Sequence, residues 1–283
     1  MLNFNNSIFF MLILFFSLSF CSIDKQNKDS ITVLSWNIKM FPYLYGFLEN
    51  RKERSDNIIK VLIETKIYDV VIFQEAFSKG VRNKIFDLLK FKYPYQVQVD
   101  DRKSFFKINS GLWVISSIPI KLIDNINFTR LGNIDWFSSK GAQLYSVKKN
   151  NQKFYIINTH LQADYKNKYG EIRAKQYEEI KDKLIIPYDD LEIPFLLCGD
   201  LNISDPKKIQ KMLKIINFSN VPLVGSIKYS FINQRPELLD YILIKKNIKF
   251  VLLEQKIINM AEKINIHPLD LSDHYPIEGI FIW

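Results

Sequence analysis

Short apolar runs recur along almost the whole chain and alternate with amphipathic stretches, and this alternation restricts the chain to an α/β fold. The predicted strands cover residues 31–38, 69–76, 111–117, 143–147, 154–161, 194–202, 240–244 and 278–283. Their β-branched and aromatic content favours strands over buried helices. The predicted helices cover residues 53–66, 82–90, 170–185 and 207–216. Because strands and helices are interleaved from end to end, we predict an α/β fold.

The same pattern indicates a single domain. A length of 283 residues allows two domains at about 150 residues each. However, no internal repeat, no linker rich in Gly, Pro or Ser and no shift in composition divides the sequence. Hydrophobic residues make up 47% of the chain, which is enough to form a full core. We therefore predict one domain over residues 31–283.

Composition excludes several classes of protein. A charged fraction of 24% with a net charge of +9 is unlike a disordered acidic chain, and nine Gly and ten Pro are too few for a collagen-like sequence. Two cysteines, Cys21 and Cys198, cannot form a disulfide framework or a four-ligand zinc site. The positive charge favours polyanions such as nucleic acid and anionic membranes, without choosing between them.

The first 30 residues resemble an export signal followed by a tether. Residues 8–20 form an uncharged apolar run of 13, the length of a signal-peptide core and shorter than the roughly 20 residues that span a bilayer. We predict an export or lipoprotein signal over residues 1–21 and a polar tether over residues 22–30. Cys21 is a candidate for acylation, although Phe20 stands where a lipobox carries a small residue, and cleavage after Ser19 or retention as an uncleaved anchor are the alternatives. We expect an exported protein, either secreted or lipid-anchored through Cys21.

Several predicted strands end in polar residues of the same kind. They are Asn37, Glu75, His160, Asp200, Asn202, Asp240, Asp273 and His274. Each residue alone is typical of a turn or a helix cap, but two of the three histidines in the chain lie in such positions. Carboxylate, amide and imidazole groups without a thiolate suit Mg²⁺, and also Mn²⁺ or Co²⁺, better than a zinc cage. The set therefore predicts a metal-assisted attack of water on phosphorus, with a base and groups that stabilise developing charge.

A serine or cysteine hydrolase is the competing chemistry. No G-x-S-x-G turn occurs in the sequence, and Cys198 lies inside an apolar strand where a nucleophile is inaccessible. The residues favour phosphoester hydrolysis over acyl transfer.

Seven segments in chain order carry a resemblance to a known superfamily. They are SWNIKM, FQEAF, SGLWVISSIPI, NTHLQAD, CGDLNIS, LDYIL and SDHYPI. This series resembles the endonuclease/exonuclease/phosphatase superfamily of Mg²⁺-dependent phosphoesterases and covers nearly all of residues 31–283. The resemblance implies a four-layered α/β sandwich, in which two mixed β-sheets pack face to face between helices and the site lies at one end of the sheets.

The resemblance also implies a role for each strand-end residue. Glu75 would hold Mg²⁺, Asn37 would help to place the metal or a phosphate oxygen, and Asp273 would lie on the metal side. His274 would be the general base, oriented by Asp240. The remaining three would act on the phosphoryl group: His160 and Asn202 by stabilising its oxygens, and Asp200 by positioning water or assisting the leaving group.

Two further segments resemble neutral sphingomyelinases, which cut the phosphocholine phosphodiester. They are THLQAD and DWFSSKGAQ, and they make Trp136, Phe137, Lys140 and Gln162 candidates for the substrate side of the site. The segment RPELLDYIL lacks the Trp-Cys-Asp-Arg pattern of inositol polyphosphate phosphatases. Secreted sphingomyelinase toxins carry a long aromatic-tipped hairpin between the LDY and SDH segments, and we expect this membrane-inserting hairpin to be absent here.

We therefore expect an exported Mg²⁺-dependent phosphodiesterase that hydrolyses sphingomyelin or a related choline phospholipid to phosphocholine and a neutral lipid. Its partner would be a phospholipid at a membrane surface, and the sequence implies no protein partner. An extracellular deoxyribonuclease-type endonuclease is the main alternative, since LDYIL and SDHYPI fit nucleases equally well. In that case the net charge of +9 would attract the chain to backbone phosphates. A catalytically inactive binding module is a third hypothesis.

Overall fold

The computed structural model describes residues 29–41, 50–99, 108–132, 135, 138–164, 168–190, 192–246 and 251–283. These ranges contain every predicted strand and every predicted helix. Among them, no helix is long and apolar enough to cross a membrane.

Two mixed sheets form the centre of the molecule. The first sheet has the order β11 (Val251–Ile257), β12 (Ile277–Ile282), β1 (Ser30–Asn37), β2 (Val70–Gln74), β4 (Trp113–Ser116) and β3 (Tyr95–Val97). The second has the order β5 (Ile120–Asn127), β6 (Gly141–Lys149), β7 (Gln152–His160), β8 (Phe195–Asp200), β10 (Asp240–Lys245) and β9 (Phe218–Ser219). Only β1 with β2, and β7 with β8, pair in parallel among these neighbours.

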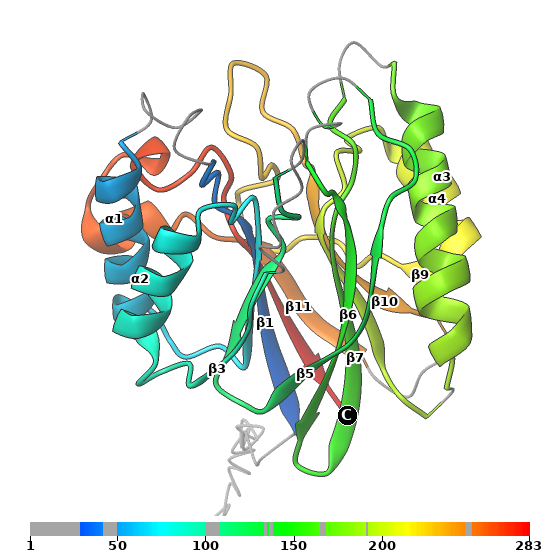
Figure 1. Ribbon diagram of the computed structural model, residues 1–283, viewed down its shortest axis with the longest axis horizontal. Helices are drawn as coiled ribbons and strands as arrows, with labels where there is room; N and C mark the ends of the chain where they lie inside the picture. Colours follow the sequence, from blue (N-terminus) through cyan, green and yellow to red (C-terminus); the bar gives the residue numbers. More distant parts are fainter. Residues whose placement is uncertain are drawn as a thin grey trace, which may run out of the picture.

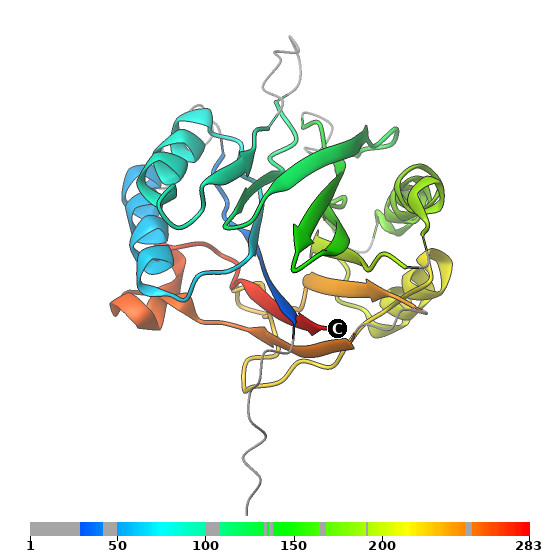
Figure 2. The same cartoon turned by 90° about the horizontal axis from the view of Figure 1, so that it is seen from below.

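Helices cover the outer face of each sheet. Helices α1 (Arg51–Glu64) and α2 (Lys79–Leu89) lie on the left in Figure 1, against the first sheet. Helices α3 (Gly170–Ile180) and α4 (Pro206–Ile216) lie on the right, against the second sheet. Figure 2 shows the two sheets facing each other between these outer helices. The predicted four-layered sandwich is confirmed.

The core explains why the central strands are continuous apolar runs. Along β1, Val33 packs between the two sheets, whereas the neighbouring Leu34 packs under the outer helices. Strand β8 behaves in the same way, because Leu196 faces the inter-sheet core and Leu197 faces the α3–α4 side. A strand that is buried on both faces needs apolar residues at successive positions, which is the pattern that the sequence shows.

The structure also contains elements that the sequence patterns miss. Strand β5 is an edge strand with only partly buried or exposed residues, so it lacks an apolar run. Strands β3, β9 and β11 also lie outside the predicted set, and the short helices η4 (Met260–Ile264) and η5 (Pro268–Asp270) follow β11. The predicted helix over residues 170–185 is α3 followed by the π-helical turn η2 (Lys181–Ile185) and the 3₁₀ turn η3 (Ile186–Tyr188).

Candidate active site

Strand pairing brings the predicted site residues to one end of the sandwich. In the first sheet, Asn37 is opposite Gln74, the residue before Glu75. In the second sheet, Asp200 is opposite His160 on one side and Asp240 on the other. Because the two sheets pack face to face, these strand ends meet across the inter-sheet space. A site of the predicted composition therefore forms from segments far apart in the chain.

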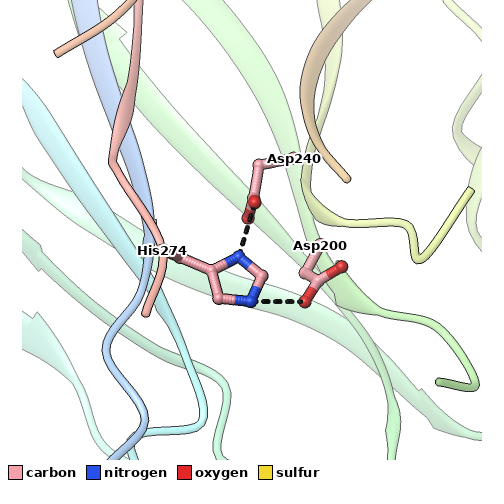
Figure 3. A group of neighbouring side chains, drawn as sticks. All are labelled: Asp200, Asp240 and His274. Atoms are coloured by element: carbon pink, nitrogen blue, oxygen red, sulfur yellow. Dashed lines mark hydrogen bonds and ion pairs between the residues drawn. The ribbon is translucent and has the colours of Figure 1, made fainter. Parts of the chain in front are cut away.

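A histidine–carboxylate pair lies at the centre of this end (Figure 3). His274 Nδ1 is 2.7 Å from Asp240 Oδ2, and both side chains are buried. The other ring nitrogen, Nε2, is 3.8 Å from Asp200 Oδ2. The ring of Phe231 covers the imidazole with a centroid distance of 4.9 Å, a contact that the sequence analysis did not anticipate. Asp240 thus fixes the orientation of the ring and directs Nε2 towards the site, as an orienting carboxylate does for a base.

Burial and neighbouring charges strongly perturb the pKa values of His274 and Asp200. Burial opposes protonation of His274, but Asp240 and Asp200 outweigh it and raise the pKa of the imidazole to about 10. Burial and the charge of Asp240 raise the pKa of Asp200 to about 7. The raised pKa values of His274 and Asp200 are typical of groups that exchange protons with a substrate.

An amide connects the two sheets on the other side of Asp200. Asn37 Nδ2 donates to Glu75 Oε1 at 3.1 Å and to Asp200 Oδ2 at 3.0 Å. The backbone N–H of Lys39 donates to Asn37 Oδ1 at 3.1 Å, which sets the orientation of the amide. Glu75 has a positive φ of 54°, so its backbone turns sharply at the end of the first sheet. The amide thereby holds the two carboxylates at a defined separation.

The donor set around Glu75 suits a hard divalent cation. Asp273 lies on this side and pairs with Lys39, whose Nζ is 3.0 Å from Asp273 Oδ2. Burial and the charge of Asp273 raise the pKa of Glu75, so the site disfavours the ionised carboxylate, and a cation bound there would favour it. Asp200, Asp240 and His274 also offer ligand atoms within 4.8 Å of one another. The short hydrogen bond between His274 and Asp240 occupies Nδ1, however, so we regard Glu75 and Asp273 as the better ligands.

The second histidine of the site is neutral and bound to a lysine. Lys140 Nζ lies 3.0 Å from His160 Nε2, 3.0 Å from the Leu161 carbonyl oxygen and 2.9 Å from Asp135 Oδ2. Burial, followed by the charges of Lys140 and His274, lowers the pKa of His160 well below its ordinary value of 6.5. Among the described residues, His160 Nδ1 has no hydrogen-bond partner. Lys140 therefore brings a buried positive charge to the site through His160.

Asp135 is a site residue that the sequence analysis missed, although it opens the DWFSSKGAQ segment. Besides its ion pair with Lys140, its carboxylate accepts the Ala163 N–H at 2.7 Å. Asp135 thus ties the segment that carries Lys140 to the loop that follows His160.

The remaining predicted residues have mixed placements. Asn202 is beside the cluster, with its N–H on Asp200 Oδ1 and its Nδ2 on the Leu161 carbonyl oxygen. The side chain of Gln162 instead binds the backbone N–H and carbonyl oxygen of Gly132, so it orders a neighbouring loop. Trp136 and Phe137 lie outside the described residues. Contact of these three side chains with substrate stays a prediction.

Comparison with known proteins agrees with this geometry. A model of the endonuclease/exonuclease/phosphatase family matches residues 34–274, a range that includes all eight strand-end residues. The chain belongs to the endonuclease/exonuclease/phosphatase family. Similar members of the family include Sphingomyelinase C 2 of Leptospira interrogans, 29% identical over 91% of this chain and 47% of that protein. The chain thus spans about half the length of the Leptospira protein.

Two further members come from Staphylococcus aureus. A phospholipase C is 29% identical over 90% of this chain and 88% of that protein. The crystal structure of a mutant beta toxin with bound magnesium ions superposes with a TM-score of 0.76 at 25% identity, covering 88% of this chain and 99% of that one. These likenesses span both sheets and not an isolated motif.

Proposed function

We propose that the chain is an exported Mg²⁺-dependent phosphodiesterase that hydrolyses sphingomyelin or a related choline phospholipid to phosphocholine and a neutral lipid. The observation that carries the chemistry is the buried His274–Asp240 pair, 2.7 Å between its atoms, at the same end of the sandwich as Glu75 and His160. The substrate class rests on similarity to proteins named sphingomyelinase C and phospholipase C, at 29% identity over about nine-tenths of this chain.

In the proposed reaction, His274 is the base. Asp240 binds Nδ1, so Nε2 is the nitrogen that takes a proton from the attacking water. Water oxygen bonds to phosphorus, the bond from phosphorus to the lipid oxygen breaks, and protonated Asp200 gives that oxygen a proton, which His274 then returns to Asp200. Asp200, with a pKa of about 7, is close enough to His274 to exchange protons near neutral pH.

The other side chains of the cluster stabilise charge. Lys140, whose ammonium donates to His160 Nε2, would place a positive charge beside the phosphoryl oxygens, where negative charge increases in the transition state. The Asn37 amide donates to both Glu75 and Asp200, and so fixes the position of the proposed metal ligand Glu75 relative to the proton-exchanging Asp200.

Glu75 and Asp273 would hold the metal, with Asn37 beside them. Their carboxylates form a crowded, partly buried set of hard oxygen ligands, which fits Mg²⁺ and also Mn²⁺ or Co²⁺. When bound, a divalent cation supplies positive charge that neutralises phosphoryl oxygens and favours the neutral form of His274.

The described residues before the SDH segment form no long hairpin of the kind expected in secreted sphingomyelinase toxins. Between β10 and Ser272, the described residues form β11, η4 and η5, and β11 pairs with β12 inside the first sheet. We propose that substrate is reached at a membrane surface. Export, through a signal over residues 1–21 and a tether over residues 22–30, is part of the proposal, but residues 1–28 lie outside the described residues.

Release of phosphocholine tests the proposal directly. The purified chain is incubated with sphingomyelin vesicles and with phosphatidylcholine vesicles, with Mg²⁺ or with EDTA. A parallel reaction contains supercoiled plasmid. Phosphocholine release that EDTA abolishes and Mg²⁺ restores, without plasmid nicking, supports the proposal. Nicking without phosphocholine release would mean that the net charge of +9 serves a nuclease.

The cellular location needs a separate test. Fractionation of cells that produce the full chain, with a Cys21→Ser variant as the matched control, distinguishes the alternatives. A lipid anchor predicts membrane-associated protein that becomes soluble in the variant. Secretion predicts soluble extracellular protein in both cases, and retention of both forms inside the cell would contradict export.

A further inference from the structure

Three buried arginines, each on a different helix, bind the loops that follow strands β1, β2 and β7. Arg54 is on α1, Arg82 is on α2 and Arg173 is on α3, and all three are buried. Arg82 donates to the carbonyl oxygens of Ala76 and Phe77, and Arg173 donates to that of Gln162 and to Asp164. The outer helices therefore hold site loops through charged hydrogen bonds and not only through apolar packing.

Arg54 differs from the other two because it joins two loops that are distant in the chain. Its Nη2 donates to the Ile38 carbonyl oxygen at 2.6 Å, and its Nη1 donates to that of Lys39 at 3.1 Å. Its Nε donates to the Leu271 carbonyl oxygen at 3.1 Å. One planar guanidinium thus spans the loop after β1 and the loop before β12.

These two loops carry the residues on the metal side of the site. The first follows Asn37, the last residue of β1, and contains Lys39, which has a left-handed φ of 48°, a conformation that non-glycine residues adopt at a cost. The second contains Asp273, which pairs with Lys39. Ser272 Oγ donates to the Asn37 carbonyl oxygen at 2.7 Å, which is a second tie between the same loops. Arg54 therefore holds both loops from the side of α1.

We propose that Arg54 is a positioning residue that sets the separation of Asp273 from Asn37 and Glu75 and thereby determines how tightly the chain binds Mg²⁺. This inference rests on the Mg²⁺ dependence in the proposed function. Without the guanidinium, three carbonyl oxygens lose a charged donor, and the left-handed turn at Lys39 loses the support that holds it. A lysine ammonium lacks the planar fork, so it cannot reproduce this three-way geometry.

The test measures metal binding independently of turnover. Tm is recorded by circular dichroism as Mg²⁺ is titrated into the unsubstituted chain and into Arg54→Met, Arg54→Lys and Arg173→Met. A cation that binds only the folded chain raises Tm with a concentration dependence that reports its affinity. Arg173→Met is the matched control because it removes another buried guanidinium from a helix, on the loop after His160.

We expect Arg54→Met to raise the Mg²⁺ concentration of the half-maximal Tm shift by about tenfold or more, as for the loss of a residue that orients metal ligands. Arg54→Lys is expected to fall between this variant and the unsubstituted chain, and it remains informative if Arg54→Met does not fold. Arg173→Met is expected to lower Tm while keeping the original Mg²⁺ midpoint.

Two results would overturn the inference. One is an unchanged Mg²⁺ midpoint in both Arg54 variants, which would give Arg54 a purely structural role. The other is an equal change of the Mg²⁺ midpoint in Arg54→Met and Arg173→Met, which would indicate a general loss of folded stability and not a specific effect on metal binding. If Mg²⁺ raises Tm with the expected difference between the variants but no phosphocholine is released, the role of Arg54 is supported and only the proposed substrate is rejected. If Mg²⁺ does not change the Tm of the unsubstituted chain, both the Mg²⁺ site and this role of Arg54 are rejected.

Discussion

His274 Nδ1 lies 2.7 Å from Asp240 Oδ2, and this hydrogen bond joins β10 of the second sheet to the segment that precedes β12 of the first. The two residues are 34 positions apart in the chain. The pair therefore depends on correct packing of the two sheets. Its geometry leaves Nε2 directed at Asp200 and determines which nitrogen can act as a base.

The first prediction concerns this hydrogen bond. Asp240→Asn keeps the shape of the side chain but removes the charge that orients and stabilises the imidazole. We expect kcat for phosphocholine release to fall by about 100-fold or more in Asp240→Asn, because general base catalysis contributes this much. The kcat of His274→Ala should fall by a similar factor. Asp124→Asn, on edge strand β5, is the matched control and should keep full activity. Unchanged turnover in both His274→Ala and Asp240→Asn would reject the assigned base.

The second prediction concerns pH. His274 must be neutral to accept a proton, so the rate should rise with pH as the imidazole loses its proton. The negative charge of Asp200 favours the protonated imidazole and helps to raise its pKa. Asp200→Asn removes that charge, so the pKa of His274 should fall and the acidic limb of kcat/KM should move to lower pH, by about one unit. Profiles between pH 5 and 10 check this, and a limb that moves to higher pH would contradict the arrangement.

The third prediction concerns the buried lysine beside His160. Lys140→Met removes a positive charge that lowers the pKa of His160, so that pKa should rise. We expect kcat to fall by about 100-fold because one stabilising charge is lost at the phosphoryl group. Lys140→Arg restores the charge and should recover part of the rate. NMR titration of His160 measures the pKa, and a pKa that does not rise in Lys140→Met would show that the lysine does not control this imidazole.

The fourth prediction concerns stability away from the site. Glu278 on β12 is buried and pairs with Lys66 and Lys256 at 2.7 Å and 3.2 Å. Burial opposes ionisation, but these lysines outweigh it and lower the pKa of Glu278 from its ordinary value of 4.5. The stabilisation is therefore present above about pH 4.5 and is lost as the pH falls through the lowered folded-state pKa.

Thermal unfolding between pH 7 and 3 measures this effect in the unsubstituted chain and in Glu278→Gln. The variant should have a lower Tm at neutral pH and should lose less of it on acidification. Parallel Tm curves for the two proteins would show that Glu278 does not carry this pH dependence.

Much of the fold was predictable because the central strands are buried on both faces and so appear as apolar runs. The runs that became β1, β2, β7, β8 and β10 all lie in the middle of a sheet. Edge strand β5 was not predictable, since Lys121, Asp124 and Asn125 interrupt its apolar residues. Edge strands are defined by their pairing partner and only weakly by their own composition.

The order of the amino acids is enough to identify which chemical groups are available and the family to which the chain belongs. Asn37, Glu75, His160, Asp200, Asp240 and His274 were all identifiable, because each follows or begins an apolar run. The partner of each group depends instead on how the chain packs in three dimensions. Lys140 meets His160 20 residues away, and Arg54 meets Leu271 217 residues away. Local periodicity reports the face and length of one element, whereas these contacts depend on strand register and on how the two sheets pack.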